Sequence, residues 1–136
     1  MPPITILREQ AKYLEQTTRG VLSTSIETTS SQTSPYSDVI DLLTRAQGAN
    51  RPAMPSGDGL FHSFYVVAPA LNDYRFQLLR IWHTINLYPV LMAREKAPAK
   101  WDVAHDQPEF LEKLKAVFSH DDTVRVVRAL ISQSRS

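Results

Sequence analysis

The sequence predicts a single α+β domain that spans residues 1 to 136. The expected parts are an N-terminal helix, a central antiparallel sheet of three or four strands in a meander, and two C-terminal helices packed on one sheet face. Two observations predict this class. Apolar residues recur every three or four positions at both ends of the chain, whereas the middle is rich in aromatic and β-branched residues between turn signals.

The N-terminal segment has the apolar spacing of a helix. Pro2 and Pro3 suit a helix start and Gly20 suits a helix end, so we expect a helix over residues 3 to 19. The apolar or small residues that share one side of this helix are Ile4, Leu7, Ala11, Leu14, Thr18 and Val21.

The next segments are weaker in pattern. Residues 21 to 29 predict a strand that frays into a loop, because nine of the twelve residues from 23 to 34 are Ser or Thr. A short apolar stripe predicts a helix over residues 36 to 47. Residues 48 to 59 are rich in Gly and Pro and predict a flexible connection.

The strongest strand signals lie in the middle of the chain. The three predicted strands of the meander are Leu60 to Pro69, Tyr74 to Ile85 and Tyr88 to Arg94. Pro69 and Pro89 cannot donate to a ladder, so both are expected at strand ends or at an edge. If Asn72-Asp73 forms a two-residue turn, the register sets His62 directly opposite His83.

The C-terminal part predicts a helix pair. Residues 97 to 105 are interpreted as a connection, and Asp106-Gln107-Pro108-Glu109 has the spacing of a capping box that starts a helix. Ser119 to Asp122 predicts a break and the start of a last helix. The Asp of each His-Asp dipeptide, Asp106 and Asp121, is expected to cap a helix rather than to bind a metal.

Composition excludes several functional classes. Fifteen Lys and Arg against 14 Asp and Glu leave a net charge of +1, without the excess typical of nucleic-acid or acidic-lipid binders. The chain has no cysteine, hence no disulfide and no thiolate nucleophile. No segment has the length of a membrane helix, so we expect a cytoplasmic protein that does not bind membranes and needs no cofactor.

The motifs that mark common enzymes are also missing. Gly-x-Ser-x-Gly, Gly-x-Gly-x-x-Gly and Gly-Lys-Ser/Thr do not occur. The leading hypothesis is therefore a non-catalytic protein-interaction or regulatory module. It would act through a sheet face bearing Tyr65, Arg80 and Trp82, residue types that interfaces favour. The partner would be another protein or a second copy of the chain in a homodimer.

Two alternatives remain open. His62 and His83 on one face could serve a small enzyme as an acid/base pair, or bind a metal with a third ligand. Arg75, Arg80 and Trp82 could bind single-stranded nucleic acid. Strand alternation places Arg80 and Trp82 on one face and Arg75 on the other, which does not favour this second alternative.

Overall fold

The computed structural model describes residues 1–31, 58–94 and 101–135. The helix expected over residues 36 to 47 lies outside the described residues, as does nearly all of the connection expected over 48 to 59. Of that connection, the structure describes only Asp58 and Gly59. Gly59 is the first residue of a strand, so the predicted connection ends earlier than expected.

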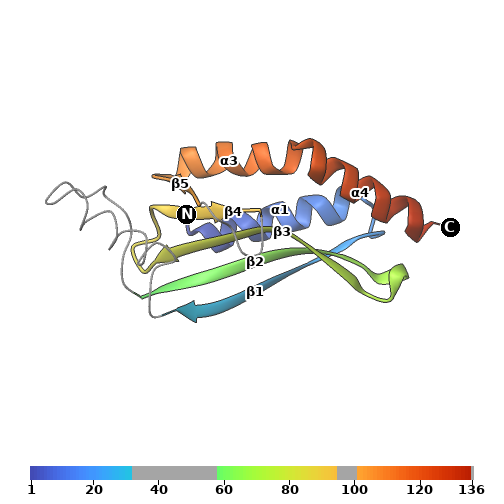
Figure 1. The fold of residues 1–136 in the computed structure, drawn as a ribbon, viewed down its shortest axis with the longest axis horizontal. Coiled ribbons are helices and arrows are strands. Elements are labelled where there is room, and N and C mark those ends of the chain that lie inside the picture. The colour runs from blue at the N-terminus through green and yellow to red at the C-terminus, as the bar shows by residue number, and fades with distance from the viewer. Residues whose placement is uncertain (32–57, 95–100, 136) are drawn as a thin grey trace, which may run out of the picture.

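The described part of the chain is an α+β fold, as predicted, with all three α-helices on one side of an antiparallel sheet (Figure 1). The sheet has five strands in sequence order, β1-β2-β3-β4-β5. The elements are α1 (Pro3–Thr17), β1 (Ser23–Ser31), β2 (Gly59–Ala68), the 3-10 helix η1 (Pro69–Leu71), β3 (Tyr74–Thr84), β4 (Val90–Ala93), β5 (Asp102–Ala104), α3 (Gln107–Ser119) and α4 (Asp121–Ser134).

The main core lies between the sheet and these helices. α1 packs against β1, α4 against β2 and η1, and α3 against β5. Four strand residues that face the helices are fully buried, as the purely apolar pattern predicted: Phe64, Val66, Leu79 and Ile81. Among the described residues, no helix is long and apolar enough to cross a bilayer.

Helix α1 follows its predicted stripe with two differences. The helix ends at Thr17 rather than residue 19, and Gly20 adopts a φ of +77°, the left-handed conformation that ends helices. Ile6 is buried although the stripe omitted it, while Leu14 is only half-buried. The helix therefore turns a slightly different side toward the core than the sequence spacing suggested.

Strand β1 begins and ends two residues later than predicted. It does not fray after residue 29 but continues to Ser31, because every residue from Ser23 to Ser31 has a pairing partner in β2. Regular pairing along the neighbouring strand outweighs the turn preference of the Ser and Thr side chains.

The β2–β3 hairpin has a different register from the predicted one. The loop is not a two-residue turn, because the last paired residues are Ala68 and Tyr74 and η1 lies between them. Asn72 and Asp73, which complete the loop, take left-handed φ values of 60° and 58°. As a result His62 lies opposite Ile81, and His83 lies opposite Leu60. The shift is two residues, so both histidines remain on one face.

The sheet has five strands rather than three or four because β5 lies within the stretch interpreted as a connection. Asp102–Ala104 pairs with β4, with Val103 opposite Leu91. Pro69 begins η1 and Pro89 precedes β4, so both prolines occupy strand ends as predicted.

The two C-terminal helices begin close to the predicted positions. Asp106 caps α3 by accepting a hydrogen bond from the Glu109 N–H at 2.9 Å, which confirms the predicted N-cap. The Glu109 carboxylate lies 3.2 Å from His105 Nδ1, so the second bond of a capping box is not seen. The cap of α4 was predicted one residue too late. His120 is the N-cap, and its Nδ1 accepts a hydrogen bond from the Asp122 N–H at 3.1 Å.

Candidate functional site

The candidate interaction site is the sheet face that points away from the helices, which we call the open face. No described helix covers it. Its side chains come from the three longest strands: Glu27 from β1, Phe61, Ser63 and Tyr65 from β2, and Arg75, Gln77 and Arg80 from β3.

A β-bulge decides which β3 residues reach the open face. Phe64 pairs with Leu79 but Tyr65 pairs with Gln77, so Leu78 is an extra residue in β3. The extra residue reverses the alternation between Gln77 and Leu79. The expectation that Arg75 and Arg80 lie on opposite faces is therefore wrong, because both lie on the open face.

Each arginine stacks on an aromatic ring of the neighbouring strand. The Arg75 guanidinium carbon lies 4.0 Å from the centre of the Tyr65 ring, and that of Arg80 lies 4.1 Å from the centre of the Phe61 ring. A guanidinium over a ring face gains electrostatic attraction and keeps its orientation. The open face thus presents two arginine–aromatic pairs along β2 and β3.

Glu27 of β1 also contributes to the open face. Its carboxylate accepts a hydrogen bond from Arg75 at 2.6 Å, and this bond raises the pKa of the Arg75 guanidinium. The two side chains are 44% and 48% exposed, so the ion pair is a surface feature that adds little stability. Its effect on the site is to neutralise one of the two arginines.

Trp82 does not belong to the exposed part of this face, contrary to expectation. It is fully buried in a second, smaller cluster with Leu91 and Trp101. Leu91 lies directly across from Trp82 because β4 pairs with β3 there. Trp101 precedes β5, the strand missing from the sequence prediction, so its contribution to this cluster was not foreseen.

Two polar groups near this face lack hydrogen bonds. Within the described ranges, Nε2 of Gln77 and Nε1 of Trp82 are buried without a partner. Leaving a buried donor unsatisfied costs about 1–3 kcal/mol. Gln77 stands opposite Tyr65 on the open face, but its amide nitrogen is already shielded there and offers no contact to a partner.

The histidine pair lies on the opposite, helix-covered face. The structure brings His62 and His83 together as predicted, with Nε2 atoms 2.9 Å apart, and both residues are buried. They are diagonal rather than direct neighbours across the hairpin. Thr28 of β1 adds a contact from its hydroxyl oxygen to His62 Nδ1 at 2.8 Å.

The partners of this pair fix its hydrogen-bond direction when both rings are neutral. His83 Nδ1 lies 2.8 Å from the Thr84 carbonyl, which only accepts, so His83 Nδ1 carries a proton. His83 Nε2 then accepts from His62 Nε2–H, and His62 Nδ1 accepts from the Thr28 hydroxyl. Burial lowers the pKa of His62 to about 4, and His83 and Arg8 act in the same direction.

These histidines offer little to a metal or a substrate. Among the described residues, no third His, Cys, Asp or Glu joins them in a group that could hold a metal ion. Each ring nitrogen already has a hydrogen-bonding neighbour within 2.9 Å. The pair works as a polar link between strands within the core.

Sequence reasoning found part of the open face and missed the rest. The sequence placed Tyr65 and Arg80 on this face, and the structure has both there. The sequence did not single out Glu27, Phe61 or Gln77. Glu27 is the single charged residue in a Ser/Thr-rich strand, a signal that could have marked it.

No family model, curated protein or solved structure matches this chain.

Proposed function

We propose that this protein is a non-catalytic interaction module that binds a protein partner through its open face. The observation that carries the proposal is the pair of stacked arginines, Arg75 on Tyr65 and Arg80 on Phe61. Arginine and tyrosine are over-represented among the residues that dominate binding energy at protein interfaces. The partner is either another protein or a second copy of the chain.

Stacking favours this role for a physical reason. A free arginine side chain loses conformational entropy when it is fixed at an interface. The aromatic rings of Tyr65 and Phe61 already hold the two guanidinium groups over β2, so less entropy remains to be lost on binding. The Arg75 side chain is 44% exposed, and its guanidinium has N–H groups besides the one that donates to Glu27, so a partner's carbonyl or carboxylate oxygens can accept from them.

The charge of the open face favours a protein over a nucleic acid. Glu27 places a half-exposed carboxylate beside Arg75, and such a group repels a phosphate backbone. A protein partner combines carbonyl oxygens with apolar surface. That combination matches the Arg75–Glu27 pair and the aromatic rings of Tyr65 and Phe61.

The buried tryptophan has a supporting role in this proposal. Trp82 packs beside Leu91 of β4 and contacts Phe61, the ring on which Arg80 stacks. Replacing Trp82 would disturb the fold, so the side chains that test binding are Tyr65 and Arg80. For the metal alternative, the described residues contain no group of three ligands that includes His62 and His83. For the acid/base alternative, the ring nitrogens of the two histidines already have hydrogen-bonding neighbours.

The test compares association of the wild type with that of Arg80→Ala. Sedimentation measures self-association, and pull-down with quantified recovery measures a retained partner. We expect Arg80→Ala to weaken the association about thirtyfold, the effect of losing about 2 kcal/mol. Arg128→Ala, which removes an exposed arginine from α4, is the matched control and should bind normally.

Two results would contradict the proposal. One is a monomeric wild type that retains no partner. The other is equal weakening by Arg80→Ala and Arg128→Ala. Circular dichroism and urea unfolding of each variant show whether weaker binding comes from a damaged fold.

A further inference from the structure

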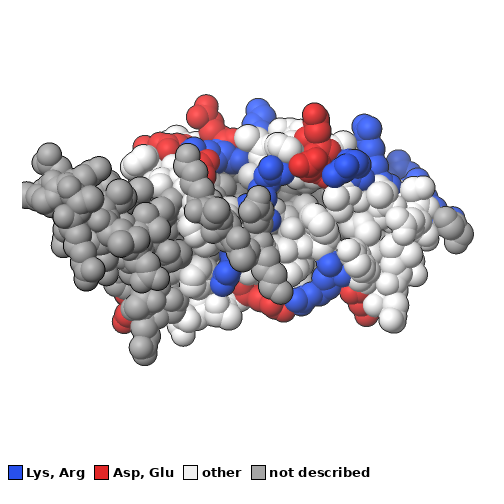
Figure 2. Space-filling view, in the orientation of Figure 1, with Lys and Arg blue, Asp and Glu red and all other residues white. Residues whose placement is uncertain are grey.

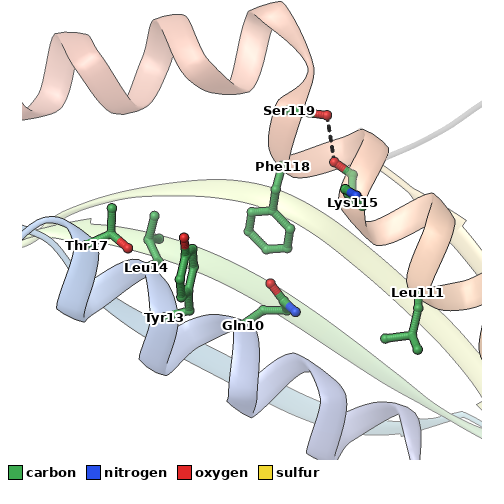
Figure 3. A pocket seen from close by; sticks show the side chains of 8 residues that line it. All are labelled: Gln10, Tyr13, Leu14, Thr17, Leu111, Lys115, Phe118 and Ser119. Atoms are coloured by element: carbon green, nitrogen blue, oxygen red, sulfur yellow. Dashed lines mark hydrogen bonds between the residues drawn. The ribbon is translucent and has the colours of Figure 1, made fainter.

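A second surface feature lies on the helical side of the molecule, far from the open face. It is a groove of about 430 Å³ between α1 and α3, which we call the α1/α3 groove (Figure 3). Figure 3 shows Tyr13 and Gln10 projecting from α1, and Phe118 and Leu111 from α3, into the space between the two helices. The Phe118 ring packs edge-on against the buried Phe64 at 5.6 Å, which anchors this side of the groove to the core.

The lining follows helical spacing on both sides. From α1 come Gln10, Tyr13, Leu14 and Thr17, and from α3 come Leu111, Lys115, Phe118 and Ser119. These positions are three, four, seven and eight residues apart, so each set forms one stripe along its helix. Each stripe covers about two turns, or roughly 10–12 Å. Two stripes of this kind leave a trough in which a third helix fits lengthwise.

The groove is open rather than enclosed. Tyr13 is 68% exposed and Leu111 is 41% exposed, although both are large apolar side chains. A pocket for a small molecule normally buries about 70–90% of its ligand, which requires walls on most sides. An amphipathic helix needs no such walls, because its own body covers the rim side chains.

The charge of the lining indicates which helix would fit. Among the described residues that line the groove, Lys115 is the one charged side chain and none is a carboxylate. Glu15 of α1 is turned away and binds Thr24 in β1, at 3.0 Å and 2.7 Å. Glu109 of α3 lies 3.2 Å from His105. No ion pair among the described residues includes Lys115.

We propose that the α1/α3 groove binds an amphipathic helix of a partner protein that presents aliphatic residues at i, i+3 or i+4, and i+7 and an acidic residue beside Lys115. The aliphatic side chains enter between Tyr13 and Leu111 and pack on Leu14 and Phe118. The acidic residue pairs with the Lys115 ammonium group. This site is independent of the open face, because it uses other residues on the other side of the sheet.

The test uses two synthetic peptides and the full chain. Each peptide has about 14 residues, covalently stapled as a helix because short isolated helices are unstable in water. Both carry Leu at i, i+3, i+4 and i+7, and they differ by one residue beside this stripe, Glu in one and Lys in the other. Fluorescence anisotropy of the labelled peptides measures binding.

We expect the Glu peptide to bind at least about fivefold more tightly than the Lys peptide, because only the Glu side chain pairs with Lys115. Lys115→Glu should reverse that order. Lys12→Glu makes the same charge change at an exposed position of α1 outside the lining, and it should leave the order unchanged. Tyr13→Ala should weaken both peptides about tenfold.

Four outcomes would overturn the proposal. The first is no saturable binding of either peptide. The second is an order of affinity that Lys115→Glu does not change. The third is tighter binding of decanoate than of the Glu peptide at the same groove, which would make a small amphiphile the occupant. Arg75→Ala changes a residue of the open face and should leave the affinity of both peptides unchanged. The fourth outcome is a loss of peptide affinity in this variant, which would place the binding on the open face.

Discussion

Acid should destabilise this protein through His62. His62 is 2% exposed, and its pKa is about 4 in the folded chain against 6.5 for an ordinary histidine. Between these two values the unfolded chain binds a proton that the folded chain does not. The free energy of unfolding therefore falls as pH decreases from 6.5 to about 4. Above pH 6.5 this contribution to stability is fully present.

The magnitude follows from the interval between the two pKa values. At about 1.4 kcal/mol for each pH unit, the interval from 6.5 to about 4 corresponds to about 3 kcal/mol. Most of that loss, between about 2 and 3 kcal/mol, is expected by about pH 4.5. For a domain of ordinary stability, about 5–15 kcal/mol, this is a substantial fraction.

Urea unfolding, followed by circular dichroism at about pH 7.5 and about pH 4.5, measures the effect. His62→Gln removes the titrating group, so this variant should lose about 2 kcal/mol less stability between the two pH values than the wild type does. His105→Gln is the control, because the His105 side chain is 68% exposed, and it should match the wild type. Equal losses in the wild type and His62→Gln would refute the reasoning.

Three further predictions concern stability, each measured by chemical or thermal unfolding. Leu7→Ala should cost about 2–5 kcal/mol because Leu7 is fully buried, whereas Leu14→Ala should cost less than about 2 kcal/mol because Leu14 is half-buried; equal costs would contradict this order. Gly59→Ala should destabilise by about 1–3 kcal/mol, since a Cβ there would lie 2.5 Å from two ring carbons of Trp82, and an unchanged melting temperature would contradict that clash. Asp106→Ala should cost about 1 kcal/mol by removing the α3 cap, and no loss would show that the cap is dispensable.

The order of elements could be predicted from the sequence because it depends on local signals. Asp106 starts α3 as its N-cap, and the left-handed Gly20 follows the end of α1. Both effects depend only on residues a few positions away in the sequence. The alternating apolar residues Phe64 and Val66 likewise show which face of β2 is buried. These local signals do not depend on how the elements are arranged in space, as long as one face of each element packs against the core.

The open face could not be predicted fully because it depends on the bulge at Leu78. One inserted residue moved Arg75 to the side of Arg80, and no turn residue or glycine near Leu78 signals this. The histidine pair survived the wrong register because a shift of two residues keeps both rings on the same face. Trp82 was misplaced because its burial needs Trp101, which precedes an unpredicted strand.

Site-specific photo-crosslinking through the open face tests the central claim most directly. A chain with p-benzoyl-L-phenylalanine in place of Val67 places the reactive group directly across from Arg75 on this face and keeps the Arg75–Tyr65 stack. A second chain with the same group in place of Tyr74, which is 53% exposed at the end of the hairpin, is the matched control. The account predicts one discrete adduct from position 67 that disappears with Arg80→Ala, and no such adduct from position 74. The same adducts from both positions, or none from position 67, would contradict it.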